Sequence, residues 1–229
     1  TGHGGYMNGS RYYGEDLPIN TWYMKRFAGL SEDGLSLWYY TDKETNEEKT
    51  TTTYSTGDFY LCGDPNPDLY GGFGTSITFH GFDLSTQFSY LVGGLTYDYG
   101  YAGMMGNPTA TSVGNRWHKD VLKAWSPENP SSTIPRWHFN DLNTTGSSDR
   151  FLIDGSYLNL QNIQVGYTLP DSWTSHLKIK NLRLYFVCDN VYYWSKRKGL
   201  DPRRSISGVG TSGKIAPFRT YSGGISLQF

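Results

Sequence analysis

The chain has 229 residues, enough for one large domain or two small ones, and its 19 tyrosines, 28 glycines and low charged fraction (18%) favour strands and loops over helical bundles. A net charge of −1 gives no electrostatic argument for a nucleic-acid partner, and two cysteines are too few for a disulfide framework. No run of 18 apolar residues is present, which excludes a transmembrane helix but not membrane strands, because these alternate apolar and polar residues.

Residues 1–67 are rich in Gly, Tyr and Thr, and the opening TGHGGYMNGS lacks the basic start and apolar core of a signal peptide. We expect mostly loop over this region. The exceptions are a short extended segment at TWYMKRF (21–27) and a solvated polar loop at TDKETNEEKTTTT (41–53).

A β-hairpin is predicted for residues 68–91, because apolar and polar residues alternate on both sides of His80-Gly81. Gly81 supplies the positive φ that a tight turn requires. One face of the hairpin carries Phe73, Ile77, Phe82, Leu84 and Phe88.

Residues 92–156 form a long connection in which RWHKDVLKAW (116–125) predicts a short amphipathic helix. Trp117, Val121 and Trp125 follow one another at i, i+4 and i+8, and the pattern stops before Pro127. Connections of this length are uncommon in compact domains and usually carry function.

A strand pair is predicted for residues 157–190, followed by a basic, Gly-rich connection at 191–218 and a terminal strand at 219–229. Ile163, Val165, Tyr167 and Leu169 alternate on the first strand of the pair. On the terminal strand, one face carries Tyr221, Ile225, Leu227 and Phe229.

Short turns alternate with long connections along the chain, as they do in outer-membrane barrels, where short turns are periplasmic and long loops are extracellular. We therefore expect an all-β fold: antiparallel transmembrane strands that end on the periplasmic side, with 1–67, 92–156 and 191–218 as mostly extracellular loops. The apolar faces, including Ile225 and Leu227, then point to lipid. The alternative is a secreted β-sandwich that binds carbohydrate, in which the same residues pack against one another.

Aromatic residues on the long connections are the candidate ligand contacts: Trp117, Trp125, Trp137, Tyr99, Tyr101, Tyr192, Tyr193 and Trp194. Aromatic rings stack well on sugars, but internal packing or an interfacial girdle is the alternative role for each. GVGTSGKI (208–215) is not a P-loop, since Ile215 follows the lysine and no helix begins there. No motif supports catalysis, a metal or a cofactor.

Four strings, in order, resemble the C-terminal part of SusC-like TonB-dependent outer-membrane transporters. GDPNPDLYGGFGTSITFHGFDLSTQFSYLVGG (63–94) is similar to that family's N-P-D segment and its following strand. WHKDVLKAWSPENPSSTIPR (117–136) is similar to its tryptophan and P-E-N-P motif. FLIDGSYLNLQNIQVGYTLP (151–170) and LRLYFVCDNVYYWSKRKGLDPR (182–203) match two further signatures, with Asn159, Gln161 and Asp189 replacing the usual Arg, Lys and Gln.

The resemblance implies a barrel of about 22 strands with a plug that lies upstream of this chain. It also implies a SusD-like surface lipoprotein over the lumen, energy from the TonB complex, and import of oligosaccharides or peptides across the outer membrane of a Gram-negative bacterium. In such proteins a C-terminal apolar face that ends on an aromatic residue is an assembly signal, here Tyr221, Ile225, Leu227 and Phe229. We expect no enzymatic activity, because no catalytic motif is present in the sequence.

Overall fold

A computed structural model of the chain describes residues 4–109, 116–141, 143, 146–175, 179–197, 199–204, 207–209 and 217–229. The chain divides into two compact units. The first, here called the loop unit, comprises Thr1–Asn66, Gly94–Asp154 and Pro202–Gly213. The second, the sheet unit, comprises Pro67–Gly93, Gly155–Asp201 and Lys214–Phe229. Strands dominate the regular structure of both, which confirms the predicted all-β class.

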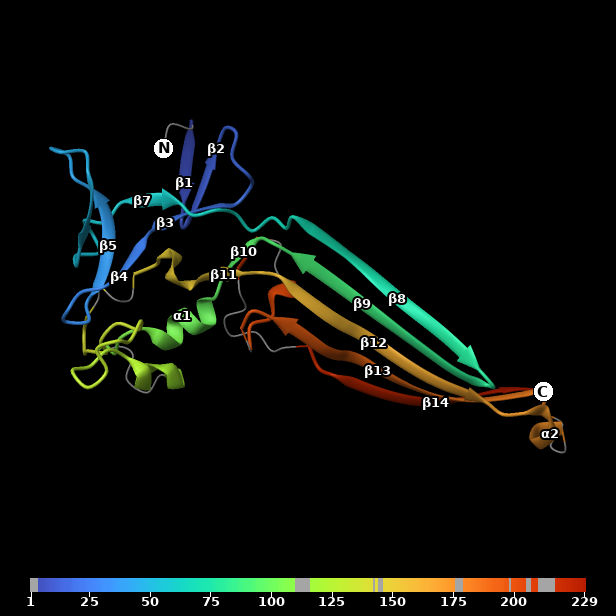
Figure 1. The fold of residues 1–229 in the computed structure, drawn as a ribbon. Helices are drawn as coiled ribbons and strands as arrows, with labels where there is room; N and C mark the ends of the chain where they lie inside the picture. The colour runs from blue at the N-terminus through green and yellow to red at the C-terminus, as the bar shows by residue number, and fades with distance from the viewer. Residues whose placement is uncertain are drawn as a thin grey trace. The chain divides into compact units, whose positions relative to one another are not determined.

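The sheet unit is one antiparallel sheet in the order β14-β13-β12-β9-β8 (Figure 1). Its strands are β8 (Leu69–Phe79), β9 (Phe82–Val92), β12 (Tyr157–Thr168), β13 (Asn181–Ser195) and β14 (Thr220–Gln228). The short helix α2 (Asp171–Thr174) and the C-terminus lie at the same end of the sheet as the β8–β9 turn.

Local sequence explains the first hairpin. His80 (φ 47°) and Gly81 (φ 84°) both have positive φ, and a two-residue turn of this kind matches the twist of the strands that it joins. The predicted hairpin is therefore confirmed, and β12 and β14 also lie where alternation predicted strands. The predicted end of the strand pair at 190 is wrong, because β13 continues to Ser195.

Each strand of the sheet unit places most of its large apolar residues on the same face, because residues that oppose one another across a ladder point to the same side. We call this the apolar face. It carries Leu69, Phe73, Ile77, Phe79, Phe82, Leu84, Phe88, Tyr90, Leu158, Leu160, Ile163, Val165, Tyr167, Leu182, Leu184, Phe186, Cys188, Tyr192, Trp194, Tyr221, Ile225 and Leu227. The opposite, polar face carries mostly small and hydrogen-bonding residues, among them Ser76, Thr78, Asp83, Ser85, Gln87, Ser89, Asn159, Asn162, Gln164, Arg183, Asp189, Ser222 and Ser226.

A β-bulge changes the alternation of β12 partway along the strand. The register of β12 shifts between Leu160 and Asn162 against both of its neighbours, and Asn190 on β13 has a positive φ of 51° at the same level. Odd-numbered residues face the apolar side after the bulge and even-numbered residues before it. As a result Leu158 and Leu160 share the apolar face with Ile163.

The loop unit contains short strands where the sequence predicted mostly loop. One sheet has the order β1-β2-β3-β7 and another β4-β5-β6, and β10 pairs with β11. The strands are β1 (Gly5–Asn8), β2 (Arg11–Gly14), β3 (Thr21–Lys25), β4 (Phe27–Leu30), β5 (Ser36–Thr41), β6 (Glu48–Thr51), β7 (Phe59–Leu61), β10 (Leu95–Tyr97) and β11 (Leu152–Asp154). The extended segment expected at 21–27 is confirmed by β3 and the start of β4, whereas the solvated loop expected at 41–53 contains β6.

Helical elements of the loop unit are short. In the described part of this unit they are α1 (Tyr99–Met105) and the 3₁₀ helices η1 (Lys119–Lys123), η2 (Asp149–Phe151) and η4 (Pro202–Arg204). The amphipathic helix predicted over 116–125 is therefore wrong: only η1 forms, and Trp117 and Trp125 lie outside it. Their rings pack at separate places in the loop unit, so tertiary contacts override the helical spacing.

The core of the loop unit is built on β3. Trp22 and Met24 are almost fully buried with Tyr97, Met105 and Phe151, and the Trp22 indole Nε1–H donates to the Leu95 carbonyl at 3.1 Å. Burying an aromatic side chain of this size contributes strongly to stability when its polar atom also finds a partner. In the part of the chain that the structure describes, no helix combines the length and hydropathy that crossing a bilayer requires.

Candidate functional site

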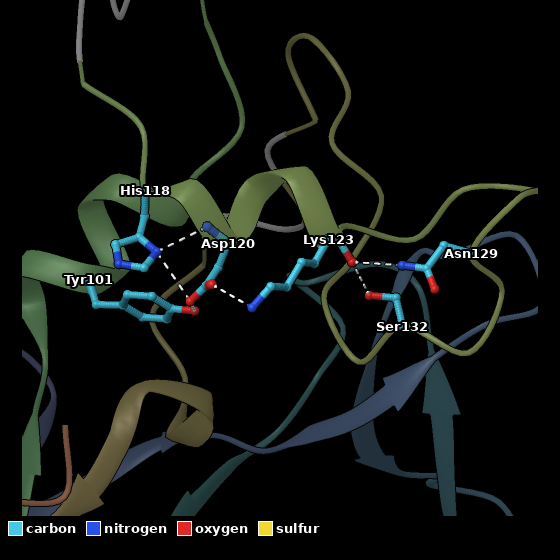
Figure 2. A network of polar contacts seen from close by, with 6 residues as sticks. All are labelled: Tyr101, His118, Asp120, Lys123, Asn129 and Ser132. Carbon is cyan, nitrogen blue, oxygen red and sulfur yellow. Dashed lines mark hydrogen bonds and ion pairs between the residues drawn. The ribbon is translucent and has the colours of Figure 1, made fainter. Parts of the chain in front are cut away.

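A polar network fixes the segment that carries two of the predicted tryptophans (Figure 2). Asp120 of η1 lies at its centre: Oδ2 accepts from the Tyr101 hydroxyl at 3.1 Å and lies 3.2 Å from Nδ1 of His118, and Oδ1 is 3.1 Å from Nζ of Lys123. Hydrogen bonding to Lys123, followed by that to Tyr101, holds the pKa of Asp120 below its usual value. The carboxylate is therefore ionised at neutral pH and joins α1 to η1.

The same network closes the loop that follows η1. The Lys123 carbonyl accepts hydrogen bonds from the Asn129 side-chain amide at 3.1 Å and from the Ser132 hydroxyl at 2.6 Å (Figure 2). The main-chain N–H of Trp125 donates to the Ile134 carbonyl at 2.8 Å. These bonds give residues 117–136 a defined shape, so the network organises this loop.

The predicted tryptophans separate into two places. Trp117 and Trp137 meet edge to face, with ring centroids 5.4 Å apart, and Trp137 is 42% exposed. Trp125 is half-buried, and its ring covers Gly34 so closely that a Cβ there would lie 2.3 Å from it. Trp137 thus keeps part of its ring exposed at the surface, whereas Trp125 packs internally.

The two tyrosines of α1 have different surroundings. Tyr101 is half-buried, with its ring against His118 and Phe151 and its hydroxyl on Asp120. Tyr99 is 38% exposed and packs on Tyr97, with ring centroids 4.4 Å apart. Internal packing accounts for Tyr101, whereas part of the Tyr99 ring remains exposed.

The tyrosines and tryptophan at 192–194 were expected on a loop, but the structure places them on β13. Tyr192 and Trp194 point to the apolar face, 4.8 Å apart and nearly half exposed, whereas Tyr193 pairs with Asn159 on the polar face. Membrane proteins place Tyr and Trp at the border between hydrocarbon and water. Trp194 therefore fits an interfacial girdle better than a ligand contact.

The C-terminal residues expected to form an assembly signal extend the apolar face. Tyr221 stacks near Phe186, with centroids 6.0 Å apart, and Ile225 and Leu227 oppose Leu184 and Leu182. Each of Tyr221, Ile225, Leu227 and the terminal Phe229 is at least half exposed in the chain. Phe73 and Ile77 are each 56% exposed as well, so these residues do not pack into a second layer as the β-sandwich alternative requires.

Several residues with functional potential were not identified from the sequence. Leu122 on η1 is 91% exposed and Phe139 is 57% exposed, which adds apolar surface near the tryptophan-bearing loop. On the polar face, Arg183 and Asp83 form a two-point ion pair across β12. Exposure of a loop residue has no local sequence signal, and the two partners of the ion pair lie 100 positions apart.

Two buried titratable groups of the loop unit have structural explanations. The Asp149 carboxylate accepts the main-chain N–H of Phe27 at 2.8 Å, and burial raises its pKa. Burial also raises the pKa of the Cys62 thiol to about 11, so it is a protonated packing group at neutral pH. Among the described residues, no group of three or more His, Cys, Asp or Glu side chains is placed to hold a metal ion.

Known proteins resemble this chain in both sequence and structure, although no family model matches it. TonB-dependent receptor P3 of Formosa agariphila is 29% identical over 98% of this chain and 22% of its own length. TonB-dependent receptor SusC of Bacteroides thetaiotaomicron is 27% identical over 77% of this chain and 17% of its own length. The chain thus spans about a fifth of the curated relatives that it matches.

Two solved structures give the same result. A structure of the RagAB peptide transporter is 25% identical with a TM-score of 0.79, over 97% of this chain and 24% of that chain. The RagAB peptide importer in its 'open-open' state is 26% identical with a TM-score of 0.75, over 98% of this chain and 24% of that chain. The predicted resemblance to a SusC-like TonB-dependent transporter fragment is confirmed by both the curated relatives and the solved structures.

Proposed function

We propose that this chain, a fragment with the sequence and fold of a SusC-like TonB-dependent transporter, forms part of the wall of an outer-membrane importer barrel of about 22 strands. The two-faced sheet carries the proposal. Its strands have 9 to 15 residues, and a tilted strand needs about 9–11 to cross a bilayer. In this arrangement the apolar face meets acyl chains, and the polar face lines a wet lumen.

The connections support one orientation of the sheet. The two-residue turn at His80-Gly81 and the α2 link belong at the periplasmic end together with the C-terminus, and the long connections 93–156 and 196–219 belong outside the cell. Aromatic residues fit both interfaces. Phe82 and Tyr167 pack together near the turn, with centroids 4.3 Å apart, and Tyr192 and Trp194 lie toward the other end.

The proposed activity is TonB-dependent uptake of oligosaccharides or peptides, with a SusD-like surface lipoprotein over the lumen and the plug and TonB-contacting segment in other parts of the protein. The relatives are named receptors and transporters rather than enzymes, and the RagAB structures are titled peptide transporter or importer. The polar face supports a hydrated path, since hydroxyls and amides outnumber charges on it.

We propose the loop unit as the surface that meets the lipoprotein or the cargo. The exposed ring of Trp137, supported by Trp117, is the strongest candidate contact, followed by Tyr99. Trp125, Tyr101 and Trp194 are weaker candidates, because the first two pack internally and the third lies on the apolar face.

An uptake assay tests the activity. Cells that lack the full-length protein are compared with complemented cells for uptake of a panel of labelled neutral oligosaccharides and short peptides, with and without the lipoprotein and with TonB inactivated. We expect uptake of one cargo class to require all three components. Equal uptake in the deletion strain for every member of both classes would contradict the proposal.

Cysteine labelling tests the orientation of the two faces independently of cargo. In the full-length protein with Cys62 and Cys188 replaced by serine, Thr78→Cys should react with a water-soluble maleimide and Ile77→Cys should react slowly or not at all. Equal labelling of these neighbours would count against a lipid-facing apolar side. Failure of this test is separate from failure of the uptake assay, which concerns cargo alone.

A further inference from the structure

An ion pair on the polar face spans three strands. Arg183 on β13 donates to Asp83 on β9 from Nε to Oδ1 at 3.0 Å and from Nη2 to Oδ2 at 2.6 Å, with β12 lying between the two strands. Two parallel bonds of this kind fix the relative position and angle of both side chains. The pair thus ties together strands that are not neighbours.

A glycine makes this contact possible. Gly166 of β12 opposes Asp83 on one side and Tyr185 on the other, and a Cβ on it would lie 2.4 Å from Asp83 Oδ1 and 2.6 Å from Arg183 Nη2. Any larger residue at this position would force the two charged groups apart. Gly166 is the single glycine of β12, so the strand offers one place where the pair can cross it.

The alternation of apolar and polar residues leaves the strand register incompletely specified. A shift of one residue exposes the wrong face and is strongly disfavoured, but a shift of two residues keeps both faces unchanged. For β9 and β12 no tight turn excludes that shift, because residues 93–156 separate them. Some other feature must select among registers that differ by two.

We infer that Asp83, Gly166 and Arg183 form the register lock that selects the native pairing of β9, β12 and β13 during assembly. Asp83 is the sole charged residue of β9, and Arg183 is the sole cation of β13. A two-residue shift of β12 against β9 would put the side chain of Gln164 or Thr168 beside Asp83 in place of the glycine. The side chains are only 23% and 29% exposed, so a shift would also leave two partly desolvated charges unpaired.

Charge reversal in the full-length protein tests the lock. We expect Asp83→Arg and Arg183→Asp each to lower the yield of folded, heat-modifiable protein in the outer membrane about tenfold, in line with the loss of charge-assisted hydrogen bonds. The double reversal Asp83→Arg/Arg183→Asp should restore the yield to within about twofold of the original, since the pair is rebuilt with opposite polarity. Gln87→Arg, which adds a cation to the same face of β9 without touching the pair, is the matched control and should assemble normally.

Disulfide trapping reports the register itself. Cysteines at Ser85 and Gln164 oppose one another in the native pairing. Cysteines at Gln87 and Gln164 oppose one another only after a two-residue shift in one direction, and cysteines at Ser85 and Asn162 only after the shift in the other direction. In each charge-reversed variant we expect cross-linking to move from the native pair to one of the two shifted pairs, and in the double reversal to return.

Two further variants keep the inference testable if the reversed charges prevent folding altogether. Asp83→Asn and Arg183→Gln remove the pair without repulsion, and their combined loss should equal that of either one rather than the sum. Two results would overturn the register lock. One is normal yield with native cross-linking in both neutral variants. The other is additive losses in the neutral variants together with no rescue by the double reversal. None of these outcomes depends on which cargo is transported.

Discussion

A cation on the apolar face should prevent assembly, whereas the same cation one residue away should be tolerated. Phe88 lies one residue from the middle of β9 (Phe82–Val92) and stacks on Phe73, with centroids 4.8 Å apart and an interplanar angle of 10°. Phe88→Arg removes a ring contact worth about 0.5–1.5 kcal/mol. It also places a guanidinium near the bilayer midplane at a cost of about 2–4 kcal/mol.

The expected loss is therefore about 3–5 kcal/mol, or a hundredfold or more in the folded fraction. Gln87→Arg puts the same group on the polar face, where we expect an effect within about 0.5 kcal/mol. Membrane levels of the two full-length variants are measured by quantitative blotting, and folding by heat-dependent mobility. Equal accumulation of the two variants, or a greater defect in Gln87→Arg, would refute the assignment of the faces.

Three further predictions concern other parts of the chain. Deleting Phe229, or replacing it with a charged residue, should lower outer-membrane abundance while leaving uptake per folded molecule unchanged, and normal abundance on a blot would contradict the assembly role. Gly34→Ala should destabilise the 117–136 loop by about 1–3 kcal/mol, because the new Cβ collides with Trp125, and limited proteolysis of the loop should become faster. Gly29→Ala is the control: Gly29 also has a positive φ but faces open space, so this variant measures the cost of the backbone strain alone. Burial raises the pKa of Asp149 in the folded protein above its ordinary value of 3.8. The stability that this group contributes is therefore fully present at pH values below 3.8, and it is lost as the pH rises through the raised pKa of the folded state. Asp149→Asn keeps the side-chain oxygen that accepts a main-chain hydrogen bond, so its thermal unfolding temperature at pH 7 should equal or exceed that of the original protein, and a lower temperature would contradict this explanation.

Alternation and turn chemistry are local signals, and they predicted the strands of the sheet unit well. The β8–β9 hairpin follows from period-two patterning around Gly81, whose positive φ the turn requires. Ile225 and Leu227 are two positions apart and therefore lie on the same side of a strand, and this spacing correctly predicted the apolar side of β14.

A bulge that was not predicted and a strand end that was predicted wrongly both had signals in the sequence of the sheet unit. Leu158 and Leu160 occupy even positions, whereas Ile163 and Val165 occupy odd ones, and this change of phase marks the bulge at Gln161. The strand predicted to end at 190 continues because the even-numbered apolar series resumes after the polar Asp189-Asn190.

The loop unit and the cross-strand pair could not be predicted because their determinants are non-local. Tyr101 reaches Asp120 from another element, and Arg183 meets Asp83 only after β12 has paired between them. The helical spacing of Trp117 and Trp125 misled for the same reason, since each ring packs on a partner that is distant in sequence.

Three adjacent strands span the same stretch of the sheet, measured along the strand direction, with different numbers of residues. From Thr86 to Phe88 β9 advances two positions, from Ile163 to Leu160 β12 advances three, and from Cys188 to Tyr192 β13 advances four. A strand that carries extra residues bends and twists more strongly at that point, so we expect the sheet to bend here. In the proposed barrel, part of the curvature of the wall would thus come from the unequal residue counts of β9, β12 and β13.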